Sequence, residues 1–303
     1  MNFGRILTAM VTPFNEKGEV DYNKVTELVN YLIANGTEGI VVAGTTGESP
    51  TLTTEEKVTL YKKVVEVVNG RVPVIAGTGS NNTKSSIELT KKAEETGVNG
   101  IMLVVPYYNK PSQEGLYQHF KAIADATTLP VMLYNIPGRT AVNMTPETII
   151  RLAKVENIVC VKEASGNLDA MSQIIEETDE SFSLYSGDDS LTLPVLAIGG
   201  VGVVSVAAHV IGNEMQEMVQ AFLNGDLKGA SSLHRKLLPM MKALFAAPNP
   251  SPVKAALQLK GVDMGSLRLP LMPLTDSERE TLKKALQPAL EKDQYQFITT
   301  IAQ

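Results

Sequence analysis

The sequence contains a single cysteine, Cys160, among 303 residues, which excludes an internal disulfide. Because Cys160 lies in the apolar run Ile158-Val159-Cys160-Val161, we expect a small buried side chain in a protein of a reducing compartment. Histidine is scarce too, and no pair of histidines has metal-ligand spacing on an expected helix. We therefore predict no metal site, and structural or solvated roles for His119, His209 and His234.

Long apolar runs and runs of basic residues are also missing. No uninterrupted apolar segment reaches membrane-spanning length, and the first residues lack a signal-peptide pattern, which predicts a cytoplasmic protein without a membrane partner. The 27 basic and 33 acidic side chains give a net charge of −6, which argues against nucleic acid as a partner. A Gly-x-Ser-x-Gly elbow is absent as well, so the sequence does not indicate a serine hydrolase.

What the sequence does contain is a regular alternation of short β-branched runs with longer amphipathic segments. Its 44% apolar and 20% charged residues are the composition of an ordinary globular protein. The alternation is typical of repeated βα units, and eight such units predict an α/β fold of the (β/α)8 TIM barrel type. The expected strands are residues 6–11, 39–43, 72–76, 100–105, 131–134, 158–162, 183–186 and 202–205.

Helical patterns separate these strands, with capping residues at their starts and glycines at their ends. They include residues 22–35, 54–69, 83–96, 113–126 and 146–154. After residue 212 no strand is expected, and helices are predicted over residues 214–223, 227–246, 252–260 and 276–291. We therefore expect a catalytic barrel over residues 1–225 and a C-terminal helical extension over residues 226–303.

Lys162 ends the sixth expected strand, where functional residues of barrels concentrate. Period-two alternation puts Cys160 and Lys162 on one face of this strand, and Val159 and Val161 on the other. If the valines pack on helices, Lys162 points into the barrel mouth, where desolvation lowers its pKa and leaves a neutral amine that can attack a carbonyl. The alternative is a lysine that begins a solvated loop and pairs with Glu163.

Two further strand ends carry polar residues. Tyr134 ends the fifth strand and Arg139 follows on its loop; a phenol can shuttle protons and a guanidinium can hold a carboxylate, although both can also be structural. The second strand runs into Gly44-Thr45-Thr46-Gly47-Glu48-Ser49, which can bind a carboxylate or form an ordinary βα turn. The run Gly199-Gly200-Val201-Gly202 precedes the eighth strand, so it suits a tight turn better than a phosphate loop.

Four segments taken together resemble the dihydrodipicolinate synthase family over nearly the whole chain. The resemblance implies a Schiff-base-forming lyase within the superfamily of N-acetylneuraminate lyase and other pyruvate-dependent aldolases. Such an enzyme condenses pyruvate with L-aspartate-4-semialdehyde to 4-hydroxy-tetrahydrodipicolinate, in diaminopimelate and lysine biosynthesis. The segments are Gly44-Thr45-Thr46-Gly47-Glu48-Ser49, Pro106-Tyr107-Tyr108-Asn109, Tyr134-Asn135-Ile136-Pro137-Gly138-Arg139-Thr140 and Val161-Lys162-Glu163-Ala164-Ser165-Gly166.

The same resemblance implies roles for individual residues and no cofactor. Lys162 would form an imine with pyruvate, while Thr46, Tyr134 and Tyr108 form a hydroxyl relay. Tyr108 would reach in from a neighbouring subunit of a homotetramer built as a dimer of dimers. Pyruvate carboxylate would be bound by Thr45 and Thr46, the carboxylate of the semialdehyde by Arg139, and the pocket would be lined further by Gly187 and Val204.

The resemblance also bears on regulation. Lysine-inhibited members of the family bind the amino acid at a subunit interface near the positions of Ser49, Asn81 and Tyr107, with histidines and a glutamate nearby. At the matching positions this chain has Thr54, Lys57 and Ser85. A cationic Lys57 and a missing carboxylate disfavour a lysine effector, so we predict weak or absent feedback inhibition.

Two alternatives remain open from the sequence. A related lyase that acts on another 2-keto acid would also form an imine at Lys162, but sialic acid lyases are expected to lack Arg139. A catalytically silent barrel that binds a small metabolite would form no imine. A comparison of aldehydes tests the first alternative, and imine trapping tests the second.

Overall fold

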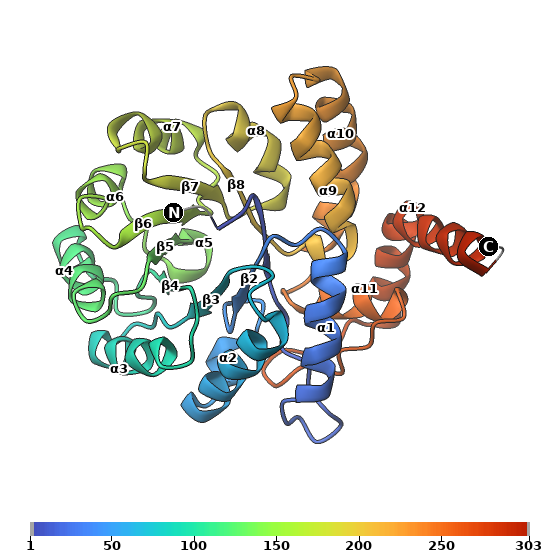
Figure 1. Ribbon diagram of the computed structural model, residues 1–303, viewed down its shortest axis with the longest axis horizontal. Coiled ribbons are helices and arrows are strands. Elements are labelled where there is room, and N and C mark those ends of the chain that lie inside the picture. The colour runs from blue at the N-terminus through green and yellow to red at the C-terminus, as the bar shows by residue number, and fades with distance from the viewer. Residues whose placement is uncertain (1–2, 302–303) are drawn as a thin grey trace.

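The computed structural model describes residues 3–301, and in it eight parallel strands form a closed barrel. Each strand pairs with its neighbours in the sequence, and β1 pairs with β8 to close the sheet (Figure 1). The predicted (β/α)8 barrel is confirmed, with all eight strands at the expected places. The strands are β1 (Ile6–Ala9), β2 (Gly39–Val42), β3 (Val74–Gly77), β4 (Gly100–Val104), β5 (Val131–Asn135), β6 (Ile158–Glu163), β7 (Ser183–Ser186) and β8 (Gly202–Ser205).

Helices surround the barrel and continue beyond its last strand (Figure 1). Those of the barrel are α1 (Tyr22–Ala34), α2 (Thr54–Val68), α3 (Thr83–Glu94), α4 (Gln113–Ala124), α5 (Pro137–Thr140), α6 (Pro146–Leu152), α7 (Leu168–Glu177), α8 (Thr192–Ala197) and α9 (Ala208–Leu223). The C-terminal extension contains α10 (Leu227–Ala243), α11 (Ser251–Leu259) and α12 (Asp276–Ile301). The exact division of the chain at residue 225 stays a prediction, and residues 1, 2, 302 and 303 lie outside the described part.

Helix starts follow the capping residues of the sequence. Thr53 accepts a hydrogen bond from the Glu56 N–H at 3.1 Å, and Glu56 accepts one from the Thr53 N–H at 2.9 Å, which completes a capping box at α2. Helix α9 begins at Ala208, before the expected residue 214, and non-helical backbone at Ile211 interrupts it. The residues before 214 are nearly all apolar, so they lack the polar positions that reveal a helical period.

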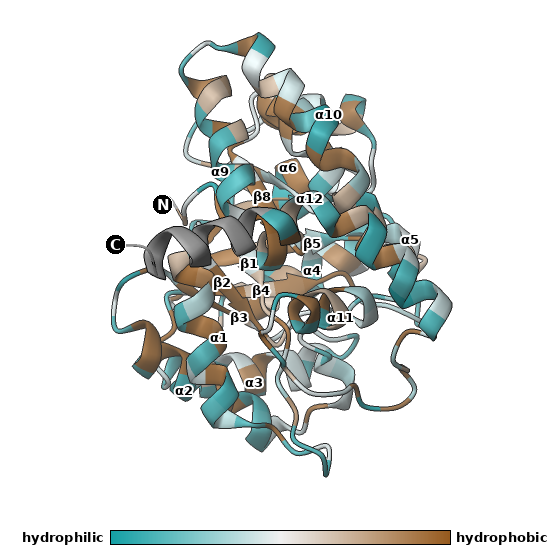
Figure 2. Ribbon diagram, turned by 90° about the vertical axis from the view of Figure 1, so that its right-hand side faces the viewer, coloured by the Kyte–Doolittle hydropathy of each residue, from teal (hydrophilic) through white to brown (hydrophobic). Residues whose placement is uncertain are grey.

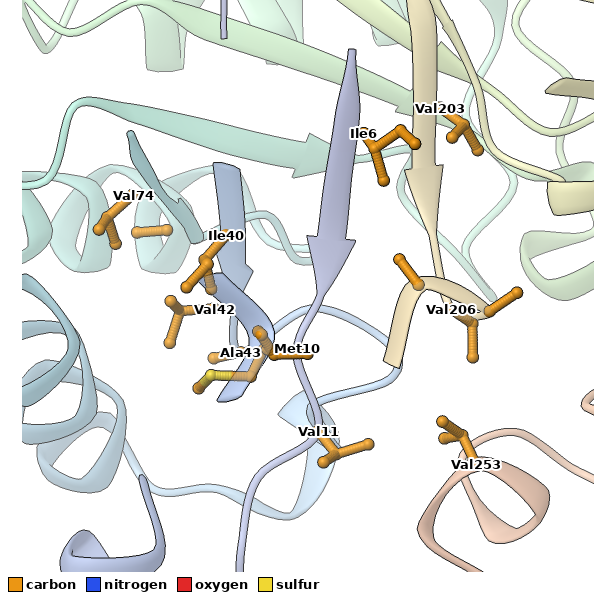
Figure 3. Packing of buried hydrophobic residues seen from close by; sticks show 14 of the residues in the cluster. Ile6, Met10, Val11, Ile40, Val42, Ala43, Val74, Val203, Val206 and Val253 are labelled. Carbon is orange, nitrogen blue, oxygen red and sulfur yellow. The ribbon is translucent and has the colours of Figure 1, made fainter. Parts of the chain in front are cut away.

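The apolar core has two layers. The outer layer lies between the strands and the helices, and Figure 3 shows residues of β1, β2, β3 and β8 in this cluster together with Val253 of α11. Figure 2 shows that the strands are largely hydrophobic, whereas hydrophilic and hydrophobic residues alternate along the helices around them. The inner layer fills the barrel, and consists of Phe3, Leu7, Ala9, Val41, Ile75, Met102, Met132, Tyr134, Cys160, Tyr185 and Val204.

Strand β6 departs from the expected alternation at one residue. Cys160 packs inside the barrel and Val161 packs in the outer layer, as predicted, but Val159 packs against the inner cluster rather than against helices. The cause is a shift of register, because Val131 pairs with Ile158 whereas Met132 pairs with Cys160. Such a bulge inserts one unpaired residue and interrupts the period of two. The alternation is restored before Lys162.

In the described part of the chain, no helix is both long and apolar enough to cross a membrane. The glycines at the start of β8 and just before it pack closely, as the sequence predicts for a tight turn. A β-carbon on Gly202 would lie 2.0 Å from the Arg5 carbonyl oxygen, and one on Gly200 would lie 2.3 Å from a Val195 methyl group.

Candidate active site

Lys162 is buried at the carboxyl end of β6, with 5% of its surface exposed. It pairs directly with Tyr134 on β5, and its Nζ lies 4.2 Å from the centroid of the Tyr134 ring. Burial penalises the ammonium form and lowers the pKa of Lys162 to about 8. The lysine therefore does not begin a solvated loop. A substantial fraction of the side chain is a neutral amine near pH 8, which is the form that attacks a carbonyl.

Two charged residues shift the pKa of the Lys162 amine in opposite directions. The carboxylate of Asp189 raises the pKa of Lys162 and the Arg139 guanidinium lowers it, and both effects are smaller than that of burial. Asp189 is buried just after β7. Its carboxylate accepts a hydrogen bond from the Ser205 hydroxyl. It also accepts from the Val206 N–H at 3.1 Å and from the Ala207 N–H at 3.0 Å. These bonds hold the carboxylate in place at the end of β8.

Tyr134 is also buried, and burial raises the pKa of its phenol to about 12. A hydrogen bond with the Thr45 side chain and the charge of Arg139 act in the opposite direction. The phenol thus keeps its proton at neutral pH and is available to donate it. Its hydroxyl partner in the glycine-rich loop is Thr45.

Thr46, the next residue of that loop, has a different partner. The side-chain amide of Asn249 donates a hydrogen bond to the Thr46 hydroxyl at 2.9 Å, and both residues are buried. Asn249 precedes α11, so this bond joins the second βα loop to the C-terminal extension. The two adjacent threonines therefore have separate surroundings.

Of the two residues expected to line the pocket further, Gly187 lies beside Lys162 and Val204 lies in the core of the barrel. A β-carbon on Gly187 would lie 3.2 Å from Cε of Lys162 and 2.6 Å from the Ala164 β-carbon, so no side chain fits there without a shift. The Gly187 N–H donates to the Glu163 carbonyl at 2.7 Å. Val204 is buried on β8 within the inner cluster.

A cavity of about 380 Å³ opens at this end of the barrel. Its lining combines hydroxyl and aromatic groups with two basic side chains and the Glu48 carboxyl group, and includes Thr45, Lys57, Tyr107, Tyr134, Arg139 and Asn249. Lys162 is not itself part of this lining; its amine faces the ring of Tyr134, which is. A cavity of this size accommodates small oxoacids.

Tyr108 is the one expected relay residue that lies away from the others. Its side chain is 89% exposed, and its backbone has a left-handed φ of 74°. The neighbouring Tyr107 lines the cavity instead, and its carbonyl accepts a hydrogen bond from Asn81 at 3.1 Å. Within one chain, Tyr108 therefore does not join Tyr134.

Two of the histidines, His119 and His209, are buried and hydrogen-bonded, His119 through its Nδ1 to the Thr83 hydroxyl at 2.9 Å. Burial lowers the pKa of His209 to about 4; its Nδ1 lies 2.8 Å from the Val206 carbonyl oxygen, and its Nε2 accepts from the Val11 N–H at 3.2 Å. Burial likewise lowers the pKa of His119 to about 4. Across residues 3–301, no three His, Cys, Asp or Glu side chains gather in a way that could hold a metal ion.

Comparison with known proteins agrees with this geometry. The model of the Dihydrodipicolinate synthetase family matches residues 2–289. The chain belongs to this family. It is 66% identical over 288 residues to 4-hydroxy-tetrahydrodipicolinate synthase 1 of Halalkalibacterium halodurans, covering 95% of this chain and 98% of that protein.

Solved structures of family members have the same fold. Dihydrodipicolinate synthase of Bacillus anthracis superposes with a TM-score of 0.94 at 62% identity, over 95% of this chain and 98% of the other. The enzyme of Cyanidioschyzon merolae, solved with lysine bound, has a TM-score of 0.93 at 51% identity, over 95% and 98% of the two chains.

The sequence did not indicate three buried residues in or near this site. Asp189 and Lys254 are charged groups that the fold buries, and nothing in their local pattern indicates burial. Asn249 lies between Pro248 and Pro250, and these prolines indicated only turn geometry. All three act through segments that are distant in the sequence, so a single chain offers no periodic signal for them.

Proposed function

We propose that this family member condenses pyruvate with L-aspartate-4-semialdehyde through an imine at Lys162. The observation that carries the proposal is the buried Lys162 amine, which has a pKa of about 8 and faces the protonated phenol of Tyr134. An amine attacks a ketone only when it is neutral, and loss of water from the resulting carbinolamine needs a proton donor. The two side chains supply these functions.

The steps balance without a cofactor. The Lys162 amine adds to the keto carbon of pyruvate, the carbinolamine loses water with a proton from the phenol, and the resulting imine loses a methyl proton to become an enamine. The enamine carbon then bonds to the aldehyde carbon of the semialdehyde, whose oxygen takes up a proton. The amino group that comes from the semialdehyde then attacks the imine carbon and displaces the Lys162 amine. This closes the ring of 4-hydroxy-tetrahydrodipicolinate and returns the free lysine, so the only molecule lost overall is the water of the carbinolamine step.

The hydrogen bonds within the chain favour Thr45 as the hydroxyl beside Tyr134 in the proton relay. The sequence-based assignment placed Thr46 there, but the hydroxyl of Thr46 is bonded to Asn249. We therefore assign Thr46 to binding of the pyruvate carboxylate, together with Thr45, which was its second expected role. Arg139 lines the cavity and would hold the carboxylate of the semialdehyde, which suits a bidentate guanidinium.

Completion of the relay by Tyr108 requires a second subunit. A tyrosine that is 89% exposed and held by left-handed backbone is placed to project from the chain rather than into its own barrel. We propose that it enters the partner's site within a tight dimer, and that two such dimers form a homotetramer. A soluble biosynthetic enzyme of this kind would act in the cytoplasm.

Weak lysine feedback is part of the same proposal. Lys57 is half-buried on α2 and lines the cavity that Tyr107 also lines, and burial lowers its pKa. Thr54 and Ser85 are exposed and carry no charge. An effector with an ammonium group would meet a lysine at this place and no carboxylate from these three positions.

Two measurements on the same preparation test the proposal. Pyruvate-dependent consumption of L-aspartate-4-semialdehyde is followed in the parent, in Lys162→Met, and in Lys84→Met, whose lysine side chain is 86% exposed. Borohydride reduction with pyruvate is followed by mass spectrometry of the peptide containing Lys162.

Turnover and a trapped adduct in the parent and in Lys84→Met, with neither in Lys162→Met, are expected. A trapped adduct without turnover of this aldehyde would indicate another 2-keto acid lyase. A folded parent that gives no adduct would contradict the imine mechanism and indicate a silent barrel.

A further inference from the structure

The side chain of Asn249 directly links the C-terminal extension to the glycine-rich loop of the site. It is 203 residues away from Thr46 in the sequence, is 6% exposed, and lines the cavity that Tyr134 and Arg139 also line. Its Nδ2 group donates to the Thr46 hydroxyl at 2.9 Å. Thr46 itself is buried and is not part of this lining, whereas its neighbour Thr45 is, so the hydrogen bond joins the cavity wall to the loop residue next to it.

The direction of this hydrogen bond determines where the Thr46 proton can go. A hydroxyl has one proton and two acceptor positions, and an amide N–H can only donate. Asn249 therefore occupies an acceptor position of Thr46. Among residues 3–301 the Thr46 hydroxyl has no acceptor for its own proton, so that proton is free for a ligand. A carboxylate is acceptor-only and is the natural recipient.

The C-terminal extension also contacts this loop through charged groups. Lys254 on α11 forms an ion pair with Glu48 at 2.9 Å, and the two side chains are 3% and 0% exposed. Glu48 also accepts a hydrogen bond from the Arg268 N–H at 3.0 Å. Glu48 is two residues after Thr46, so the extension contacts the loop at a second point close to the asparagine bond.

We propose that Asn249 is a positioning residue that orients the Thr46 hydroxyl as a donor to the carboxylate of the 2-keto acid. This proposal rests on the proposed function, because it assumes that the keto acid binds at Lys162. It makes the C-terminal extension part of substrate binding by the barrel. Asn249 acts through Thr46 and not on the reacting atoms.

The test measures the pyruvate concentration that gives half-maximal borohydride trapping at Lys162. Loss of one hydrogen bond to a charged ligand group corresponds to about a tenfold weaker binding, so Asn249→Ala is expected to raise this concentration about tenfold. Asn249→Asp keeps the shape of the side chain but supplies a carboxylate that accepts the Thr46 proton and repels the keto acid. We expect it to raise the concentration further than Asn249→Ala does.

A double-mutant cycle separates positioning from a general loss of structure. In a Thr46→Val background, Asn249→Ala should change half-saturation by less than about twofold, because the hydroxyl that it orients is gone. The control is Asn224→Ala, at an exposed asparagine at the end of α9. Circular dichroism and thermal unfolding report whether each variant folds; if Asn249→Ala does not fold, the isosteric Asn249→Asp carries the test.

The outcomes separate the two proposals. Failure of the parent to form any adduct contradicts the proposed function itself. A parent that forms the adduct, with unchanged half-saturation in both Asn249 variants, overturns the role of Asn249 alone. The role of Asn249 is also overturned if the double variant raises the half-saturating pyruvate concentration by the product of the two single-variant factors. The asparagine would then act independently of Thr46.

Discussion

Replacement of Lys162 by methionine should stabilise the protein while it abolishes imine formation. The amine is buried, with 5% of the residue exposed, and burial lowers its pKa from 10.5 to about 8. At 1.36 kcal/mol per pKa unit, this shift corresponds to a cost of about 3 kcal/mol for the charged lysine in the folded protein. Methionine has a similar length and no charge, so it removes this cost.

The expected gain is smaller than the full cost, because the variant also loses the contact of the amine with the Tyr134 ring. A contact of this type contributes about 0.5–2 kcal/mol, which leaves a net gain of about 1–3 kcal/mol at pH 7. Between pH 8 and 10.5 the unfolded chain binds a proton at this lysine that the folded chain does not. Stability of the parent therefore rises through that window, and the advantage of the variant shrinks.

The assay is denaturant unfolding of the parent and of Lys162→Met at pH 7 and pH 10, at one fixed subunit concentration. The exposed Lys84→Met variant should differ from the parent at neither pH. A Lys162→Met protein that is less stable than the parent at pH 7 would refute the reasoning. An equal gain at both pH values would also refute it, since a source other than the buried charge would then be responsible.

Three further predictions follow from the same contacts. The rate of imine trapping at subsaturating pyruvate should rise about tenfold per pH unit below pH 8 and level off above it, because only the neutral form of Lys162 reacts; a profile that is flat from pH 6 to 9 would contradict the lowered pKa. Lys254→Met leaves Glu48 charged and buried, so unfolding experiments should show a loss of about 3–5 kcal/mol, and the Lys254→Met/Glu48→Gln double variant should recover much of it. Millimolar lysine should leave the initial rate of the parent unchanged, and strong inhibition would show that Lys57 does not exclude the effector.

The strands and the buried position of Lys162 were readable from the sequence because both depend on local pattern. Eight β-branched runs separated by amphipathic segments leave few arrangements other than a parallel barrel. Once the barrel is assumed, the position of Lys162 at the end of a run places it at the face where barrels bind substrates. Burial at that position then follows from alternation with Cys160, and the structure confirms it.

Details within this frame were decided by tertiary contacts. Val159 packs inward because a register shift between two strands interrupts a period that the sequence of one strand cannot reveal. Thr45 and Thr46 are identical residues in adjacent positions, and only their partners, Tyr134 and Asn249, distinguish them.

The sequence by itself determined the barrel, the extension of helices after it and the lysine at its mouth, since these follow from periodicity and strand order. Only the tertiary structure decided that Asn249 meets Thr46 and that Lys254 pairs with Glu48, contacts that span about two hundred residues of chain. Such contacts depend on how loops from opposite ends of the sequence meet over the barrel mouth. Local sequence propensity cannot predict these contacts. Their hydrogen bonds and buried charges form only when the whole barrel has closed and brings the two loops together.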